Sequence, residues 1–546
     1  MKGADLRRNL AHRVAIVLTL LAGAAALTLV MAGPADAATV RYALVLPDTA
    51  MLRAAPHDSA PVQAPLVQGE LVELRADKLD FVQVWEPRRE RGGYLRAAQV
   101  RPLGMAAADA PELLALLRFL RDRPGAEPLG LGVAAAYLRA APAGTIDAEP
   151  FDAIGTLAER LARRANAARP DDAGVVAQRE AAAALGVAFV AIDTPLGIHL
   201  CYDGEAFRHA LALRPTPEQA ARAALALSRF DCVAPQATPV AQWQADRDRV
   251  ALLDAVPVRE LPAYLRNRVR VRVAGLRAAL AFEESRRAVQ LPEGERAAAR
   301  AAMQADGQRA LEALAGVDKA ELADDDQAAY AEAAVRVGAS RWAAEPVGAI
   351  APALAPAPVK AAAPGQASPT PPPGHAITAA ATRSPPAVVT RPGDPGQTCV
   401  LLVDATHPAD APLARRCTYG TVWTASARVD ASQRLLALAV QPLAAWRELW
   451  LFRRDDSGWQ VQVLPPSADD PSLGYVEFAG WVPGGRELLA VREVREVRDA
   501  ARVQRSFEVL SAQTLETLHH ADAPTSLSAF QRWPDAQWRR GTVAVR

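Results

Sequence analysis

The stretch that decides the fold lies in the C-terminal third of this 546-residue chain: VDASQRLLAL at residues 429–438, echoed by VPGGRELLAV at residues 482–491. In both copies a polar or glycine-rich turn precedes a run of Leu, Ala and Val, which is the pattern of a turn that leads into a buried strand. A fainter third copy covers residues 533–538 and ends in a short run at 542–545. Residues 398–546 are therefore predicted to form an antiparallel β-rich domain with repeats about 50 residues apart, near the length of a propeller blade.

The second copy carries a family resemblance. Its sequence Trp481-x-Pro483-x-Gly485 resembles the turn of blades in the Tol-associated β-propeller family. The resemblance covers two to three blades, whereas a closed propeller needs at least about four. It therefore implies either an incomplete, sheet-stacked relative or a propeller that another chain completes.

A linker is predicted before this domain, at residues 346–397. Thirteen of the 43 prolines fall in this segment, mixed with Ala, Ser and Thr. Such a composition buries too little apolar surface to offset the entropy lost on ordering, so the segment is expected to be disordered and extended. It would either hold two modules apart across an envelope or simply connect them.

Residues 108–345 are predicted to form an irregular α-helical domain. Long helices rich in Ala, Arg and Glu are expected over 258–289, 292–315 and 321–342, folded back on one another at short breaks. Thr216, followed three positions later by Gln219, predicts a capping box. Residues 187–201 interrupt the helices and indicate either a β-hairpin or a loop between helix ends.

Residues 39–104 read as several short strands, which favours a compact β-barrel. At this point the residues resemble a bacterial SH3 (SH3b) domain. The resemblance rests on Leu52-Arg53, Pro56, Ser59-Ala60-Pro61, Leu66, Gly69, Val72, Leu74, Phe81-x-x-Val84, Gly93-Tyr94-Leu95 and Val100. Tyr94 stands where the family usually has Trp. The chain is thus expected to be a multidomain α+β protein.

The SH3 resemblance implies binding of cell-wall peptides or of other proteins rather than catalysis. The candidate ligand-binding residues in this module are the aromatic Tyr42, Trp85 and Tyr94. An aromatic side chain of this kind can equally serve only to pack the small domain. Both interpretations stay open at this stage.

The first 38 residues are predicted to be a signal peptide or an N-terminal anchor. Arg7, Arg8 and Arg13 precede an uncharged apolar run over 14–31, and the small residues Ala35 and Ala37 follow Gly33-Pro34. This is the order of a secretory signal with an A-x-A cleavage site. An uncleaved segment would instead be an inner-membrane anchor with its arginines in the cytoplasm. Both alternatives export the remainder, to the periplasm or the medium.

The four cysteines agree with export. Cys201, Cys232, Cys399 and Cys417 form an even, small set, as expected for disulfides in an exported chain. We predict the local pairs Cys201 with Cys232 and Cys399 with Cys417. No C-x-x-C or H-x-x-x-H spacing accompanies them, so no metal site is predicted.

Charge and motifs suggest a binding protein more than an enzyme. The net charge of +1 implies no bulk attraction to nucleic acid or to anionic membrane. No catalytic motif occurs in a credible context, and no catalytic residue or cofactor is predicted. The predicted function is an exported, non-catalytic envelope binding or scaffold protein, with a cell-wall peptide or an envelope protein as its partner. The alternative is a peptidoglycan hydrolase or a regulator of one.

N-terminal sequencing of the exported protein tests the signal peptide. We expect a new terminus at the small-residue site around Ala37, because the helix-breaking Gly33-Pro34 and the A-x-A pattern present it to a signal peptidase. An exported product that retains Met1 would contradict cleavage and favour the anchor.

Overall fold

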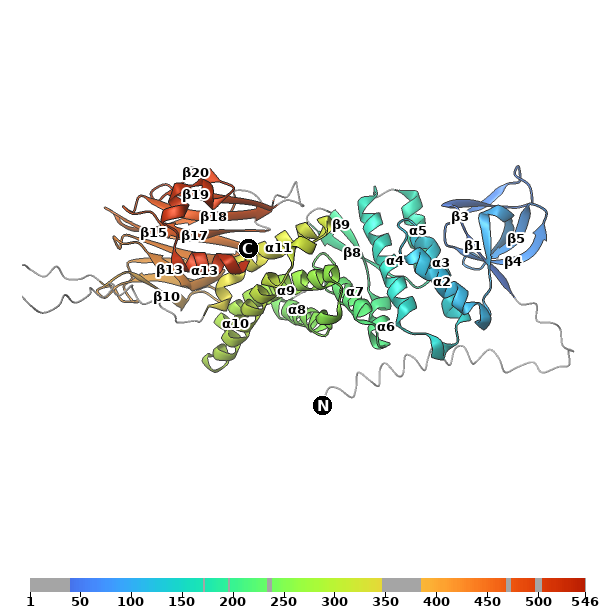
Figure 1. The fold of residues 1–546 in the computed structure, drawn as a ribbon, viewed down its shortest axis with the longest axis horizontal. Helices are drawn as coiled ribbons and strands as arrows, with labels where there is room; N and C mark the ends of the chain where they lie inside the picture. The colour runs from blue at the N-terminus through green and yellow to red at the C-terminus, as the bar shows by residue number, and fades with distance from the viewer. Residues whose placement is uncertain are drawn as a thin grey trace, which may run out of the picture. The chain divides into compact units, whose positions relative to one another are not determined.

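A computed structural model of the chain describes residues 40–169, 172–194, 197–232, 238–345, 384–467, 473–495 and 503–545. The fold is mixed α+β with several antiparallel sheets, as predicted at the level of class. Contacts divide the chain into two compact units, Met1–Met105 and Ala106–Arg546 (Figure 1). The predicted export segment and residues 346–383 of the predicted linker lie outside the described residues. None of the described helices is long and apolar enough to cross a membrane.

The first unit is a seven-stranded sheet in the order β3-β2-β6-β5-β4-β1-β7. Its strands are β1 (Arg41–Val45), β2 (Thr49–Arg53), β3 (Val62–Val67), β4 (Leu71–Lys78), β5 (Phe81–Glu86), β6 (Arg91–Arg96) and β7 (Val100–Leu103). Alternate residues face one core; on β4 these are Val72 and Leu74, and on β5 they are Val82 and Val84.

The predicted barrel is not closed. Strands β3 and β7 stand at the two ends of the sheet, and no pairing among the described residues joins them. The sheet has one core, to which all seven strands contribute, among others with Ala50, Leu66, Leu95 and Val100. The expected compact β module is present, as a sheet that does not close into a barrel among the described residues.

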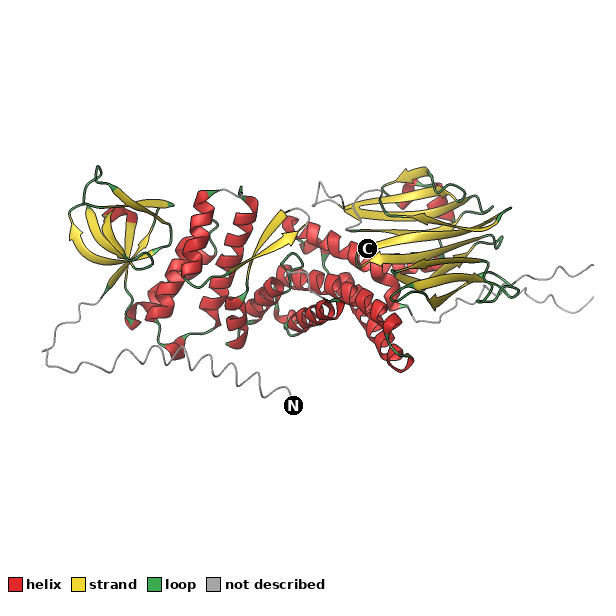
Figure 2. Cartoon of the chain, turned by 180° about the vertical axis from the view of Figure 1, so that it is seen from behind, coloured by secondary structure: helices red, strands yellow, loops and turns green. Residues whose placement is uncertain are grey.

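The second unit begins with helices, grouped together in Figure 2. They are α2 (Ala110–Arg121), α3 (Glu127–Ala140), α4 (Ala148–Ala167), α5 (Ala173–Ala184), α6 (Glu205–Ala212), α7 (Pro217–Leu227), α8 (Pro239–Asp254), α9 (Ala263–Gln290), α10 (Glu293–Ala315) and α11 (Asp324–Ser340). The short 3₁₀ helix η6 (Arg341–Ala344) follows α11.

Three sequence predictions in the helical region are confirmed. The Thr216 hydroxyl accepts from the Gln219 backbone N–H, and the Gln219 side chain accepts from the Thr216 N–H, which completes the capping box of α7. Residues 187–201 contain the hairpin, with β8 (Phe189–Thr194) paired antiparallel to β9 (Gly197–Tyr202). The long helices α9, α10 and α11 pack together around Val271, Leu314 and Val337.

The C-terminal part of the same unit contains, among the described residues, one sheet of three strands and one of eight strands. The smaller sheet holds β10 (Ala387–Pro392), β11 (Thr398–Val403) and β12 (Ala414–Thr418). The larger sheet consists of two meanders. The first is β13 (Thr421–Val429), β14 (Leu435–Leu443), β15 (Trp446–Asp455) and β16 (Gly458–Leu464). The second is β17 (Gly474–Trp481), β18 (Glu487–Arg495), β19 (Val503–Ser511) and β20 (Thr517–Ala521). A short parallel pairing of β15 with β17 joins the two meanders.

The three-stranded sheet and the two meanders of the larger sheet are stacked, because the central strands bury both faces. On β14, Leu435 and Ala437 face a core shared with β17 and β18, whereas Leu436 and Leu438 face a core shared with β11. This two-sided burial explains the continuous apolar run at 435–440, since a strand exposed on one face would alternate.

The repeated turns occupy equivalent places in the two meanders. The first copy connects β13 to β14, and the second connects β17 to β18. The Asp430 carboxylate accepts hydrogen bonds from the backbone N–H groups of Ser432, Arg434 and Leu435, which fixes the first turn. In the second turn Gly484 and Gly485 have φ of 101° and 68°, a region that favours glycine.

Two further predictions from the sequence are wrong, one about an element type and one about a boundary. The third copy of the repeat is not a strand: residues 536–545 form helix α13 (Ala536–Val545), because Asp535 accepts from the N–H groups of Gln537 and Trp538 and caps it. The predicted linker also ends too late, since Ala387–Pro392 is strand β10. Val388 of this edge strand packs on the core of the first meander, and Pro392 closes it, where proline is tolerated.

The helices and the sheets are joined by a buried ion cluster. Arg447 of β15 is fully buried; its Nη1 donates to the carbonyls of Gly338 (2.6 Å) and Ala339 (3.1 Å), near the end of α11. Its Nη2 donates to Glu477 of β17 at 3.1 Å, and Arg341 of η6 binds the same carboxylate. Burial alone would raise the pKa of Glu477, but Arg341 and Arg447 together lower it, so the carboxylate stays charged.

Neutralising this carboxylate should destabilise the second unit. Glu477→Gln leaves two buried arginines without a counter-charge, so the free energy of unfolding is expected to fall by about 3–5 kcal/mol in urea denaturation. The matched control is Glu293→Gln, whose side chain is 81% exposed and pairs with Arg296; we expect a change within about 0.5 kcal/mol.

The same ion cluster predicts that the stability of the second unit depends on pH. Because the folded pKa of Glu477 lies below its ordinary value of 4.5, its stabilising contribution is present above that value and is lost as the pH falls through the folded pKa. The wild type should therefore lose more stability in acid than Glu477→Gln does. Equal acid sensitivity of the two proteins would contradict this account of the cluster.

Candidate functional site

The three aromatic residues singled out in the sequence lie on one face of the β1–β7 sheet. Tyr42 is on β1, Trp85 on β5 and Tyr94 on β6, and each is half-buried. Their strand neighbours Ala43, Val84 and Leu95 belong to the core. Since side chains alternate along a strand, the three aromatic residues project from the opposite, outer face.

A carboxylate lies between two of these rings. In the register of the sheet, Tyr42 is directly opposite Glu73 of β4, and Glu73 is directly opposite Trp85. Residues directly opposite one another on adjacent strands have Cβ atoms about 5 Å apart. Tyr42, Glu73 and Trp85 therefore form a continuous row across three strands, which we call the aromatic row.

Tyr94 lies beside this row rather than in it. It pairs with Gln83, which is two residues before Trp85 on the same face of β5. The structure thus places Tyr42 and Trp85 on either side of Glu73, with Tyr94 and Gln83 in the next row. Glu73 was missed by the sequence reasoning, although its place between the core residues Val72 and Leu74 is a period-2 signal that could have shown which face it occupies.

Two glycines of β6 shape the sheet at this face. Gly92 is opposite Trp85, and a Cβ there would lie 3.6 Å from the indole Cε3, so the missing side chain leaves that side of the ring uncovered. Gly93 is required by close packing: a Cβ would lie 2.6 Å from Leu52 Cγ and 2.9 Å from the backbone oxygen of Arg53. The Gly-Gly pair therefore keeps β2 close and the Trp85 ring accessible.

The charges around the row are largely paired. The Glu73 carboxylate accepts a hydrogen bond from Arg75 on the same strand and is 17% exposed. At one end of the core, Arg89 lies 3.6 Å from Glu70 and 3.5 Å from Glu86. Burial raises the pKa of Glu70 above its ordinary value, while Arg89 opposes the shift. The contacts of Arg89 with Glu70 and Glu86 stabilise the loop between β5 and β6.

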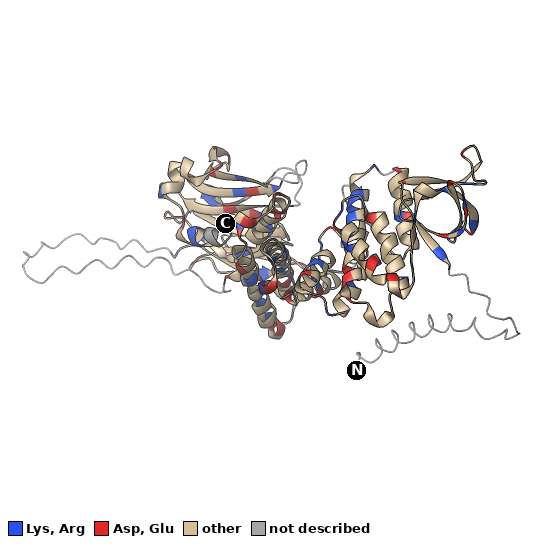
Figure 3. Ribbon diagram, turned by 45° about the vertical axis from the view of Figure 1, so that its right-hand side comes forward, with Lys and Arg blue, Asp and Glu red and all other residues tan. Residues whose placement is uncertain are grey.

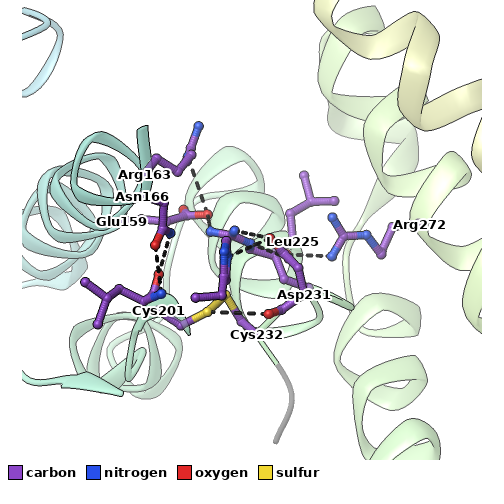
Figure 4. Close-up of a disulfide and its surroundings, with 11 residues drawn as sticks. Glu159, Arg163, Asn166, Cys201, Leu225, Asp231, Cys232 and Arg272 are labelled. Carbon is purple, nitrogen blue, oxygen red and sulfur yellow. Dashed lines mark hydrogen bonds and ion pairs between the residues drawn. A yellow bond between two sulfur atoms is a disulfide. The ribbon is translucent and has the colours of Figure 1, made fainter. Parts of the chain in front are cut away.

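The first predicted disulfide is present. Cys201 of β9 is bonded to Cys232, which follows α7, and their Cα atoms are 5.6 Å apart (Figure 4). Asn166 of α4 bonds both the N–H and the carbonyl of Leu200, at 2.8 Å each, which holds β9 against α4. Asp231 pairs with Arg229, which also binds Glu159 at 3.0 Å.

The second predicted disulfide joins Cys399 and Cys417, which face each other directly on β11 and β12. It covalently fixes the register of the outermost sheet. Together the two bonds use every cysteine of the chain. Figure 3 shows the positions of basic and acidic residues interspersed along the ribbon of the helices and strands, and the net charge of the chain is +1.

One group of side chains has the composition of a metal site. Ligand atoms of His199, Cys201 and Cys232 lie within 4.8 Å of one another. Both sulfurs belong to the disulfide and are not thiolates, so they are poor metal ligands in this state. His199 Nε2 lies 3.2 Å from Asp231, which gives it a polar neighbour.

Comparisons with known proteins give no match: no family model, no curated protein and no solved structure is similar to this chain.

The disulfide at Cys201 and Cys232 should stabilise the helical region. It closes a loop with a sequence separation of 31 residues. Replacing both cysteines by serine is expected to lower the free energy of unfolding by about 3–4 kcal/mol, because the unfolded chain regains the entropy of the open loop. Titration of the denatured, unreduced wild type should find no free thiol; four free thiols would contradict both pairings.

Proposed function

We propose that this chain is an exported, non-catalytic binding protein whose first unit is an SH3-like module that binds peptides of the cell envelope. The observation that carries the proposal is the aromatic row, with the Glu73 carboxylate between the rings of Tyr42 and Trp85. Rings give apolar contact area, and a carboxylate accepts hydrogen bonds from amide or ammonium groups. A peptide that carries a free amine offers both kinds of group.

Localisation follows from the same proposal. The signal-like N-terminus and the use of all four cysteines in disulfides support an oxidising compartment, either the periplasm or the medium. If residues 1–38 are retained, the protein would be anchored in the inner membrane and face the periplasm. The partner would be a cell-wall peptide or an envelope protein; neither nucleic acid nor a cofactor is part of the proposal.

The stacked sheets would serve as a second recognition surface. We take the two meanders as relatives of propeller blades, because the repeated turn occupies the same place in each. They are joined by the parallel pairing of β15 with β17 and are followed by α13 rather than by a third blade. In this proposal they present a second surface for envelope partners.

Trp85→Ala tests the binding face. Retention of the full exported chain on purified peptidoglycan sacculi should weaken at least about tenfold, because truncating a central aromatic side chain removes much of the binding free energy. Glu73→Gln should also weaken retention, since it removes the charge that would attract an ammonium group.

The control is Trp533→Ala, a tryptophan that is 42% exposed in the other unit. Its retention should equal that of the wild type. Circular dichroism would verify that each variant is folded. No retention of the wild type at about 100 µM, or equal losses for Trp85→Ala and Trp533→Ala, would overturn the proposal.

A further inference from the structure

A cavity with an apolar floor and a basic rim lies between the helices and the sheets of the second unit. It has a volume of about 250 Å³ and is lined by residues of α9, α10 and η6 on one side and of β10, β11 and β13 on the other. The sequence did not predict it, because its walls come from segments far apart in the chain; Ser285 and Thr421, for example, are 136 positions apart. The hydrogen bond between the hydroxyls of Ser285 and Thr421, at 2.6 Å, joins α9 to β13 within its lining.

The floor of the cavity is apolar and aromatic. Met303, Trp342 and Trp423 line it, and all three also belong to the small core that joins the helices to the sheet. Trp423 donates its indole N–H to Gln441 at 3.0 Å, so its hydrogen-bonding group is already used. The floor therefore offers ring and thioether surface to whatever enters.

The rim is basic. Arg286 of α9, Arg296 and Arg300 of α10 and Arg391 of β10 line it, against one acid, Glu345. Arg296 and Arg300 are four residues apart and so lie on the same side of α10. The rim is open to solvent at the exposed side chains of Arg300, Arg391 and Tyr419.

The four arginines are not equally engaged. Arg296 pairs with Glu293 at 2.6 Å, and Arg391 pairs with Asp410 at 2.5 Å. Among the described residues, the guanidinium groups of Arg286 and Arg300 have no hydrogen bond and no ion pair within 4 Å. Arg286 lies 5.8 Å from the centroid of the Phe282 ring and interacts electrostatically with Glu283, and neither contact uses its N–H groups in a hydrogen bond. Both guanidinium groups therefore have N–H donors for an incoming anion.

We infer that this cavity is a binding site for a small organic anion, with a phosphate or carboxylate head group held by Arg286 and Arg300 and an apolar or ring portion on the Trp342–Trp423 floor. Arginine is suited to this role because its planar fork makes two parallel hydrogen bonds to either head group. The hydroxyls of Thr390 and Thr424 also line the cavity and provide further donors.

The size of the cavity limits the ligand. Pockets for drug-sized ligands have volumes of about 300–1,000 Å³, so this one suits a compact anion of one ring or a short chain. The site belongs to the second unit, and it is independent of the peptide-binding face proposed for the first.

Isothermal titration calorimetry on the full exported chain tests the inference with four probes. Phenyl phosphate and phenylacetate share a ring and differ in the head group, benzyl alcohol keeps the ring without the charge, and inorganic phosphate is the head group alone. We expect at least one of the two ring anions to bind, benzyl alcohol not to bind and inorganic phosphate to bind more weakly. The stronger of the two ring anions identifies the head group.

Substitutions locate the site. The double substitution Arg286→Gln and Arg300→Gln should weaken binding of the ring anion at least about tenfold, because charge-assisted hydrogen bonds are lost. The matched control is Arg309→Gln, an exposed arginine of α10 that does not line the cavity; it should bind as the wild type does. The double change to Lys keeps the charge and should weaken binding less than the change to Gln. No binding of either ring anion up to about 5 mM, equal binding of benzyl alcohol, or an equal loss in Arg309→Gln would overturn the inference.

Discussion

The second unit depends on one buried carboxylate. The Glu477 carboxylate forms ion pairs with both Arg447 and Arg341. Arg447 also donates hydrogen bonds to two carbonyls near the end of α11. The C-terminal end of a helix carries partial negative charge, so a buried arginine there is favourable. The chain approaches closely at the same place: a Cβ on Gly338 would lie 2.5 Å from the Tyr475 ring. The helices and the sheets are therefore one compact unit.

This arrangement positions the cavity. With α11 fixed on the sheet, η6 follows directly and brings Trp342 against Trp423 and Met303. The guanidinium carbon of Arg341 lies 4.0 Å from the centroid of the Trp342 ring. The guanidinium carbon of Arg428, which is on β13, lies 5.5 Å from the same centroid. Cation–aromatic contacts of this kind strengthen when they are shielded from water. The aromatic floor of the anion site is thus held by the same cluster that joins the helices to the sheets.

Local signals in the sequence predicted much of this fold. The capping box at Thr216, the hairpin around Cys201 and both cysteine pairs depend on residues close in sequence, and all are present. The prediction of a third repeat was wrong because Asp535 caps a helix where the apolar run suggested a strand. Long-range partners could not be predicted: Arg447 and Gly338 are 109 positions apart, and nothing in either neighbourhood pairs them. Glu73 was missed for a different reason, since only the strand register places it between Tyr42 and Trp85.

The central functional claim is that the aromatic row is a peptide-binding face. Hydrogen exchange of the full exported chain, with and without a soluble cell-wall stem peptide, tests it most directly because it reports where the peptide binds. The amides of β1, β4 and β5 should exchange more slowly when the peptide is present, while those of β13–β20 should not change. Protection confined to the sheets of the second unit, or no protection at saturating peptide, would contradict the claim.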